Sequence, residues 1–303
     1  MRIGLLSAIV LALAASLTVS PASAAPVGPS WTDACAGSDF DSLGRLAVSS
    51  TARGTTAREP ELHQVHTDAP AQRGRGANFR VTVPTWVHVV SDGEIGNVSD
   101  RAIRDQIQVL NMTFGGFEGG VATGFGFELA GITRTDNAEW HYASISGERP
   151  MKRALHRGGD DTLNVYLTTA GPYLGWAYLP DVTERGNAYL DGIVVDWESL
   201  RGVSDTYRGR FDQGETATHE AGHWLNLEHT FYGGCNAHGD FVDDTPPERT
   251  PTSGCPVGKD TCREPGVDPI HNYMDYSFDQ CYTEFTAGQA ARMQDAWLFW
   301  RAG

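Results

Sequence analysis

The most informative residues of the chain are His219, Glu220, His223 and His229. Residues four apart share one face of a helix, so His219 and His223 can direct both imidazoles at one metal ion. Glu220 lies about 100° further round that helix, where its carboxylate can reach a metal-activated water instead of the metal. Zinc held by three protein ligands keeps one position open and lowers the pKa of a bound water toward about 7. The pattern therefore predicts hydrolytic zinc chemistry.

His229 can join the same ion only if the chain turns back. A continuous helix would separate His219 from His229 by about 15 Å along its axis, whereas zinc–nitrogen bonds are about 2.0 to 2.1 Å long. The helix must therefore end between His223 and His229. We predict that it ends at Asn226, because asparagine is second only to glycine in tolerating the left-handed conformation that ends many helices.

A structural zinc site is the main alternative. Such a site is normally closed by four protein ligands and has no use for Glu220, so the catalytic interpretation is favoured. The remaining histidines lack metal-ligand spacing and are predicted to be ordinary surface or core residues: His63, His66, His88, His141, His156, His238 and His271.

The elements that must position this segment follow from hydrophobic patterning. Ile103, Ile107, Leu110 and Phe114 recur at helical spacing after a possible cap at Ser99 or Asp100. Val- and Thr-rich runs predict strands. The expected strands span residues 80–90, 125–133, 163–168 and 192–197, and the expected helices span 100–114, 214–225 and 286–300. Strands mixed with helices predict an α/β or α+β layered fold.

The N-terminal part predicts export. An apolar run over residues 3–19 follows Arg2, and Ala22-Ser23-Ala24 provides a small-residue cleavage site, so residues 1–24 are expected to be a signal peptide. A membrane anchor is the alternative, but the run is short for a bilayer span. Residues 25–79 are expected to be a prosegment and linker ending in Arg73-Gly74-Arg75-Gly76; a disordered tail is the alternative. The domain of residues 80–303 is then secreted, extracellular and not membrane-bound.

Charge is concentrated in that domain. Of a net charge of −15, the first 79 residues contribute nothing, because their basic and acidic side chains balance. This excess argues against nucleic acid and anionic membranes as partners and is compatible with cations or basic substrates. A merely solubilising surface is the other interpretation. We expect a monomer.

Four of the five cysteines, Cys235, Cys255, Cys262 and Cys281, lie in the last third of the chain, and Cys35 lies alone. In an exported protein the four predict two disulfides, and their spacing leaves all three pairings open.

The zinc segment, together with Asn272-Tyr273-Met274-Asp275-Tyr276, resembles the metzincin zinc peptidases and, within them, the pappalysin family. The resemblance extends from residue 78 to the end of the chain. It implies an upper subdomain (about 80–229) with a twisted, mostly parallel sheet, a loop-rich lower subdomain (about 230–303), and zinc in the cleft between them. It also implies a zinc metalloendopeptidase that acts on proteins or peptides and is made as a proenzyme.

Carried over residue by residue, the resemblance makes His219, His223 and His229 the zinc ligands and Glu220 the general base. Met274 would form the hydrophobic turn beneath the metal, although plain core packing also suits a methionine. Tyr276 would hydrogen-bond the developing oxyanion; the alternative is a packed surface tyrosine. The family also implies the disulfides Cys235–Cys262 and Cys255–Cys281.

Three further assignments rest on the same resemblance. Asp279 matches the base of the pocket for the residue after the scissile bond and would favour Arg or Lys; a solvated loop aspartate is the alternative. A calcium-binding loop is implied by Asp240, Asp243 and Thr245, since calcium prefers oxygen ligands; an Asp-rich turn without metal is the alternative. Cys35 would occupy the open zinc position in the proenzyme, although Ala36 departs from the family's usual Cys-Gly and leaves a free or intermolecular thiol open.

One departure falls within the zinc segment, where the family usually has Gly at the position of Asn226, and it predicts local strain. The expected mechanism has Glu220 deprotonate the attacking water and then protonate the leaving amine, while Tyr276 and zinc stabilise the oxyanion. The rival interpretations are a secreted binding module with non-catalytic zinc and a hydrolase of non-peptide amides.

Overall fold

The computed structural model describes residues 69–72, 75–183, 186–236 and 238–302. The predicted signal peptide, most of the predicted prosegment and Cys35 lie outside these ranges, so those assignments stay predictions. Within the described ranges, none of the helices is long and apolar enough to cross a membrane.

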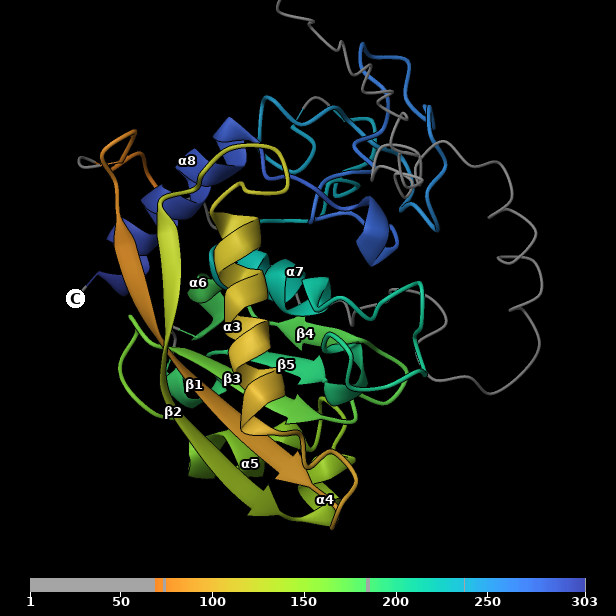
Figure 1. Ribbon diagram of the computed structural model, residues 1–303. Coiled ribbons are helices and arrows are strands. Elements are labelled where there is room, and N and C mark those ends of the chain that lie inside the picture. Colours follow the sequence, from red (N-terminus) through yellow and green to blue (C-terminus); the bar gives the residue numbers. More distant parts are fainter. Residues whose placement is uncertain (1–68, 73–74, 184–185, 237, 303) are drawn as a thin grey trace, which may run out of the picture.

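Five strands form one sheet in the order β2-β1-β3-β5-β4 (Figure 1). Neighbours are parallel except β4, which runs antiparallel to β5 at one edge. The strands are β1 (Val81–Ser91), β2 (Phe125–Asp136), β3 (Leu163–Thr168), β4 (Gly175–Ala177) and β5 (Ile193–Asp196). Every residue of β3 and β5 is buried, as expected for parallel strands covered on both faces. The mixed, mostly parallel sheet confirms the predicted fold class.

Helices cover both faces of the sheet. On one face α3 (Asp100–Phe114) and α7 (Glu215–Trp224) contact each other, α3 also contacts β2, and α7 contacts β4 and β5 (Figure 1). The other face has its own core cluster, which includes Met151 and Leu155 of α5 (Glu148–Leu155). The short elements are α4 (Ala138–His141), α6 (Pro180–Thr183), and the 3-10 turns Ala188–Leu190, Trp197–Ser199 and Asp279–Cys281.

The predicted helix at residues 100–114 is confirmed. The Ser99 side chain accepts a hydrogen bond from the Ala102 amide and so caps the helix. Its predicted apolar stripe, from Ile103 to Phe114, is buried against the sheet, and Gly115 ends the helix. The predicted strands also form, but sequence patterning missed β4, α4, α5 and α6.

The chain after His229 is mostly irregular and holds two disulfides, Cys235–Cys262 and Cys255–Cys281. This is the pairing that the family resemblance implies. The last helix begins with a capping box formed by Thr286 and Gln289, as α8 (Ala287–Ala296). It does not continue as one α-helix to residue 300, because Trp297–Arg301 forms a wider π-helical turn. That turn brings the Arg301 guanidinium to Asp191 and to the Trp224 carbonyl.

The described part of the predicted linker contacts the end of α8. Arg75 pairs with Asp295 at 2.7 Å, the Gln72 amide donates to the same carboxylate, and the Gly76 amide donates to Gln294. Phe79 is buried against Phe125. The globular domain therefore starts slightly before β1.

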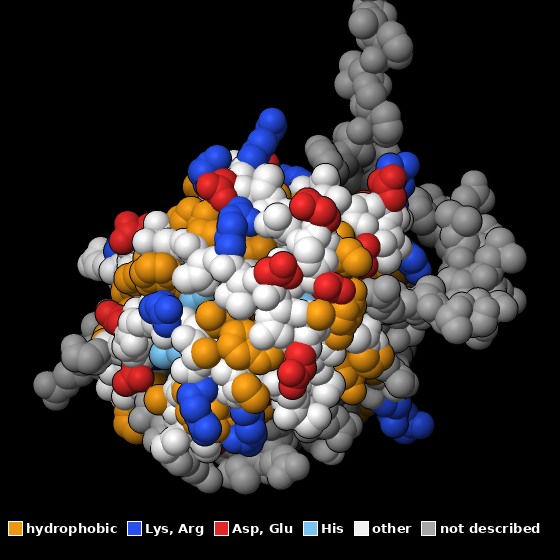
Figure 2. Space-filling model, turned by 90° about the horizontal axis from the view of Figure 1, so that it is seen from below, with side chains coloured by type: hydrophobic (Ala, Val, Ile, Leu, Met, Phe, Trp, Pro, Cys, Tyr) orange, Lys and Arg blue, Asp and Glu red, His pale blue; other side chains and the backbone are white. Residues whose placement is uncertain are grey.

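Charged side chains are mixed over the face shown in Figure 2, where Lys and Arg lie scattered among acidic and hydrophobic side chains. The exclusion of nucleic acid as a partner stays a prediction.

Candidate active site

The N-terminus of α7 depends on a glycine. Gly214 has a φ of 95° in the left-handed region, and a Cβ there would lie 2.7 Å from Gln106 Oε1. In return Gln106 Nε2 of α3 donates to the Gly214 carbonyl at 2.9 Å. One turn later Thr113 and Thr218 join α3 and α7 through their hydroxyls at 2.9 Å. Because residue 214 is a glycine, Gln106 of α3 can approach it closely and fix the start of α7 by this hydrogen bond.

The predicted turn at Asn226 is confirmed. Asn226 has a φ of 74°, its amide donates to the His223 carbonyl, and the Leu227 amide donates to the Gly222 carbonyl at 3.0 Å. This hydrogen-bond pair is the Schellman motif that ends helices. The Asn226 side chain is fully buried, and neither of its polar atoms has a hydrogen-bond partner among the described residues. In addition to the predicted backbone strain, burial of these two polar atoms costs desolvation free energy.

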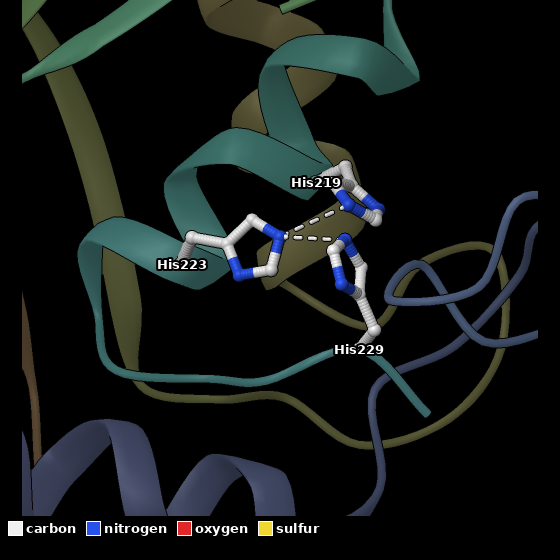
Figure 3. A group of neighbouring side chains, drawn as sticks. All are labelled: His219, His223 and His229. Carbon is white, nitrogen blue, oxygen red and sulfur yellow. Dashed lines mark hydrogen bonds between the residues drawn. The ribbon is translucent and has the colours of Figure 1, made fainter. Parts of the chain in front are cut away.

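The turn brings three imidazoles together (Figure 3). His223 Nε2 lies 3.1 Å from both His219 Nε2 and His229 Nε2. The Nδ1 atoms of His219 and His223 lie 2.5 and 2.7 Å from the carbonyl oxygens of Tyr273 and Leu227. A carbonyl only accepts, so both Nδ1 atoms carry protons, and in the neutral imidazoles both Nε2 atoms then present lone pairs.

This arrangement fits zinc. Two Nε2 lone pairs cannot hydrogen-bond each other, whereas ligands on a tetrahedral zinc with bonds of 2.0 to 2.1 Å lie about 3.3 Å apart. The Nδ1 contacts are of the kind that orient metal-bound histidines. The residues present therefore suit a divalent cation with nitrogen ligands.

Aromatic rings support His229. Its ring stacks on Phe231 at 4.6 Å between centroids, and the ring of Tyr276 packs edge-on at 4.9 Å. Tyr276 also lies 5.7 Å from the ring of His219. The structure thus places the ring of Tyr276 beside the triad.

Met274 lies against the zinc helix. It is fully buried, and a Cβ added to Gly222 would overlap its Sδ. The Met274 carbonyl accepts from the Thr230 amide at 3.2 Å, next to His229. The turn at residues 273–274 therefore contacts both segments that carry the histidines. Met274 therefore packs against the helix that carries His219 and His223.

Glu220 follows His219 on α7 and is buried. Asp279 is also buried, which excludes the solvated-loop alternative. Its Oδ2 accepts from the Gln213 amide at 2.8 Å, just before α7 begins.

Asp279 shares its surroundings with a residue that the sequence analysis missed. Glu215, in the first turn of α7, hydrogen-bonds Asp279 through its side chain. Burial raises the pKa of Asp279 to about 7, and burial with the neighbouring Asp279 raises the pKa of Glu215 well above its usual value. The two carboxyl groups therefore share a proton near neutral pH. No spacing rule pairs residues 215 and 279, so only the fold reveals the pair.

The three residues of the predicted calcium loop differ in burial. Asp240 and Thr245 are buried and joined by a hydrogen bond of 2.7 Å from the Thr245 hydroxyl, and Asp243 is exposed. Burial raises the pKa of Asp240 to about 7. Asp244 has a separate role, because it accepts from the Thr286 hydroxyl and the Gly288 amide at the start of α8.

Comparison with known proteins identifies the family. The model of peptidase family M43, described as pregnancy-associated plasma protein-A, matches residues 193–297. Extracellular metalloprotease 1 of Coccidioides posadasii is 46% identical over 229 residues, which cover 74% of this chain and 79% of that protein. The extracellular metalloprotease of Pyricularia oryzae is 45% identical over the same length, covering 74% and 77%. The chain belongs to peptidase family M43.

Solved structures agree with this membership. Mature mirolysin of Tannerella forsythia in complex with a cleaved peptide is 30% identical, with a TM-score of 0.62 over 72% of this chain and 92% of that one. A promirolysin mutant of the same organism gives a TM-score of 0.65 at 28% identity, over 74% and 83%. As an M43 member the chain is a metalloendopeptidase, and the family implies a zinc cofactor. Its relatives are named as extracellular, which points to secretion. The binding-module interpretation is set aside.

The Glu215–Asp279 pair predicts a pH-dependent stability. Both folded-state pKa values are raised, so between about pH 4 and 7 the folded protein holds protons that the unfolded chain has released. The pair's contribution to stability therefore falls as pH rises through that window. Replacing Glu215→Gln should reduce the drop in urea midpoint between pH 5 and pH 8, measured with zinc saturating. Glu139→Gln, exposed in the first turn of α4, is the matched control. An unchanged drop in the Glu215 variant contradicts the shared proton.

Proposed function

We propose that this metalloendopeptidase hydrolyses peptide bonds with Glu220 as the general base and with zinc on His219, His223 and His229. The observation that carries the proposal is the tautomer arrangement of the triad, because Nδ1–H contacts with carbonyls leave the Nε2 lone pairs of His219 and His223 facing His229. Zinc, when bound there, supplies the Lewis acidity that makes a water nucleophilic near neutral pH.

The chain's own groups supply the rest of the reaction. Glu220 accepts the proton of the attacking water and then delivers it to the leaving amine. The Tyr276 hydroxyl donates a hydrogen bond to the carbonyl oxygen as that oxygen gains negative charge. The aromatic contacts of Tyr276 with His229 and Phe231 support this placement.

The sheet edge provides a place for the substrate. β4 is the edge strand next to α7 and is antiparallel to β5. An extended peptide can add to such an edge through main-chain hydrogen bonds. A substrate held in this way lies beside the helix that carries His219 and Glu220.

The general-base role predicts the effect of Glu220→Gln. The amide keeps the shape of the side chain but cannot take a proton, so kcat for a fluorogenic peptide should fall on the order of 10²- to 10⁴-fold. Zinc content by elemental analysis should stay at the wild-type value, since Glu220 is not a proposed ligand. A Glu220→Gln protein with full zinc and full activity would overturn the mechanism. Casein cleavage abolished by a chelator and restored by zinc separates this enzyme from a hydrolase of small amides only.

We further propose that Asp279, with Glu215, favours Arg or Lys after the scissile bond. The support is the buried pair of carboxyl groups, which can hold a net negative charge for a cationic side chain. A buried charge binds an opposite charge from a ligand strongly when the protein itself supplies no opposite charge nearby.

Paired peptides test this preference. Asp279→Asn should lower the ratio of kcat/KM for a peptide with Arg after the cut to that for a matched Leu peptide, by roughly tenfold or more. Because Asp279 also accepts from the start of α7, general damage lowers both rates alike and leaves the ratio unchanged. If the wild-type enzyme cleaves the Arg and Leu peptides with nearly equal kcat/KM, the proposed role of Asp279 in the preference is wrong.

We also propose that Asp240, Asp243 and Thr245 bind calcium. A buried carboxylate with a raised pKa is stabilised by a hard cation, and the raised pKa of Asp240 comes mainly from desolvation.

Calcium should therefore raise the melting temperature of the wild-type protein and not that of Asp240→Asn. Asp260→Asn, on an exposed aspartate of the same subdomain, should respond as the wild type does. A melting temperature that is indifferent to calcium in the wild type contradicts the site.

The remaining proposals concern biosynthesis. We propose that residues 1–24 direct secretion, that residues 25–79 keep the enzyme latent, and that Cys35 is the thiol that blocks the open zinc position. Protein or peptide substrates, no nucleic-acid or membrane partner and a monomeric mature form remain the expected associations.

A further inference from the structure

The edge strand β4 lies directly against the Glu220 carboxylate. A Cβ built on Gly175 would lie 2.6 Å from Glu220 Oε1 and 3.0 Å from its Cδ. It would also lie 2.6 Å from the Val194 carbonyl oxygen on β5. Separations below 3.0 Å are essentially never seen for real Cβ atoms. Position 175 therefore admits only glycine as long as Glu220 and the Val194 carbonyl keep their places.

Successive side chains of β4 point to opposite faces of the sheet, which explains why position 175 lies against Glu220. Trp176 points to the opposite face, where its indole donates to Glu148 Oε2 at 2.7 Å. Gly175 and Ala177 therefore face α7, and Ala177 packs in the same cluster as Ala217 and Ala221. Position 177 tolerates a methyl group. At position 175 the Glu220 side chain occupies that space.

The wall formed by β4 is fixed by its partner strand. Gly175 pairs with Val195 in the antiparallel register, and the Asp196 amide donates to the Leu174 carbonyl at 2.7 Å. Glu220 is 1% exposed, so its carboxylate is confined between α7 and this wall. A glutamate in solution has three free torsions, and such confinement removes most of that freedom.

We propose that Gly175 is a positioning residue for Glu220. Its missing side chain leaves the slot that holds the carboxylate against β4, the strand along which the substrate main chain would lie. The inference rests on the proposed role of Glu220 as general base. It also explains why a strand of three residues begins with a poor strand former.

A double-mutant cycle tests the proposal. Gly175→Ala should push the carboxylate aside and lower kcat on the order of 10²-fold, with KM and zinc content close to the wild-type values. Glu220→Asp has one methylene fewer, so it vacates the space that the new methyl group needs. In the Glu220→Asp background, the added loss from Gly175→Ala should therefore be several-fold smaller. If Gly175→Ala lowers kcat by the same factor in both backgrounds, the effect comes from the Val194 contact and the proposal is overturned.

The same coupling can be read without turnover. In the zinc-free protein, Gly175→Ala should lower the urea midpoint, and the shift should shrink in a Glu220→Ala background, where no carboxylate fills the slot. Gly159→Ala is the control, because its nearest neighbour to a new Cβ is Asp161 Oδ1 at 3.6 Å; its shift should be small and equal in both backgrounds. Equal shifts from Gly175→Ala in both backgrounds overturn the contact.

Folding failures are also informative. If Gly175→Ala does not fold but Gly175→Ala with Glu220→Ala does, the clash with Glu220 is supported. If neither folds, the Val194 carbonyl is responsible and the proposal fails. A wild-type protein that cleaves no peptide would refute the general-base function, while the urea measurements would still decide the contact.

Discussion

Helix α7, which carries His219, Glu220 and His223, is held at both ends by polar and charged groups from the C-terminal third of the chain, and the candidate active site depends on this clamp. The Asp279 carboxylate accepts from the Gln213 amide at the N-terminus of α7. At the other end the Arg301 guanidinium donates to the Trp224 carbonyl at 2.8 Å and stacks on the Trp224 ring. Arg292 Nε donates to the Asn226 carbonyl at 2.8 Å. A carboxylate at the N-terminus and guanidinium groups at the C-terminus complement the helix dipole. All ten residues of the helix are buried, including the polar ones, so its position is set by the protein groups that surround it.

The clamp links α7 to the C-terminal segment of the chain. Residues 271–301 supply the carbonyl that orients His219, the methionine under Gly222, the tyrosine beside His229 and the two arginines. Shifting this segment would displace the rings of His219 and His229 together. Pre-organised groups of this kind lower the reorganisation needed during reaction, which is why a loop-rich region can still build a precise site.

The sequence predicted the site best where local geometry decides. Spacing of four residues on a helix placed His219 and His223 together, and the short reach of a metal bond required a turn near Asn226. Sequence failed where distant contacts decide. Glu148 and Lys152 have the spacing of a solvated surface pair, yet both are fully buried, and Glu148 is bound by Trp176 and Tyr178. Likewise β4, Gly175 and Glu215 have no periodic signal, because their roles come from the side chains that the fold brings against them. Spacing also left three disulfide pairings open, and the choice among them came from family resemblance.

The disulfide Cys255–Cys281 ties the turn at Asp279 to the preceding loop and so makes it dependent on redox conditions. Cys281 lies in the same 3-10 turn as Asp279, and its partner lies 26 residues earlier in an irregular loop. A loop region with few regular elements has little hydrophobic core of its own, so a crosslink contributes much of its order by restricting the unfolded chain. The turn that holds Asp279 against the segment before α7 is thus tied by a bond that is stable in an oxidising compartment. Reduction of that bond would remove the crosslink that restrains the turn at Asp279, where the clamp begins.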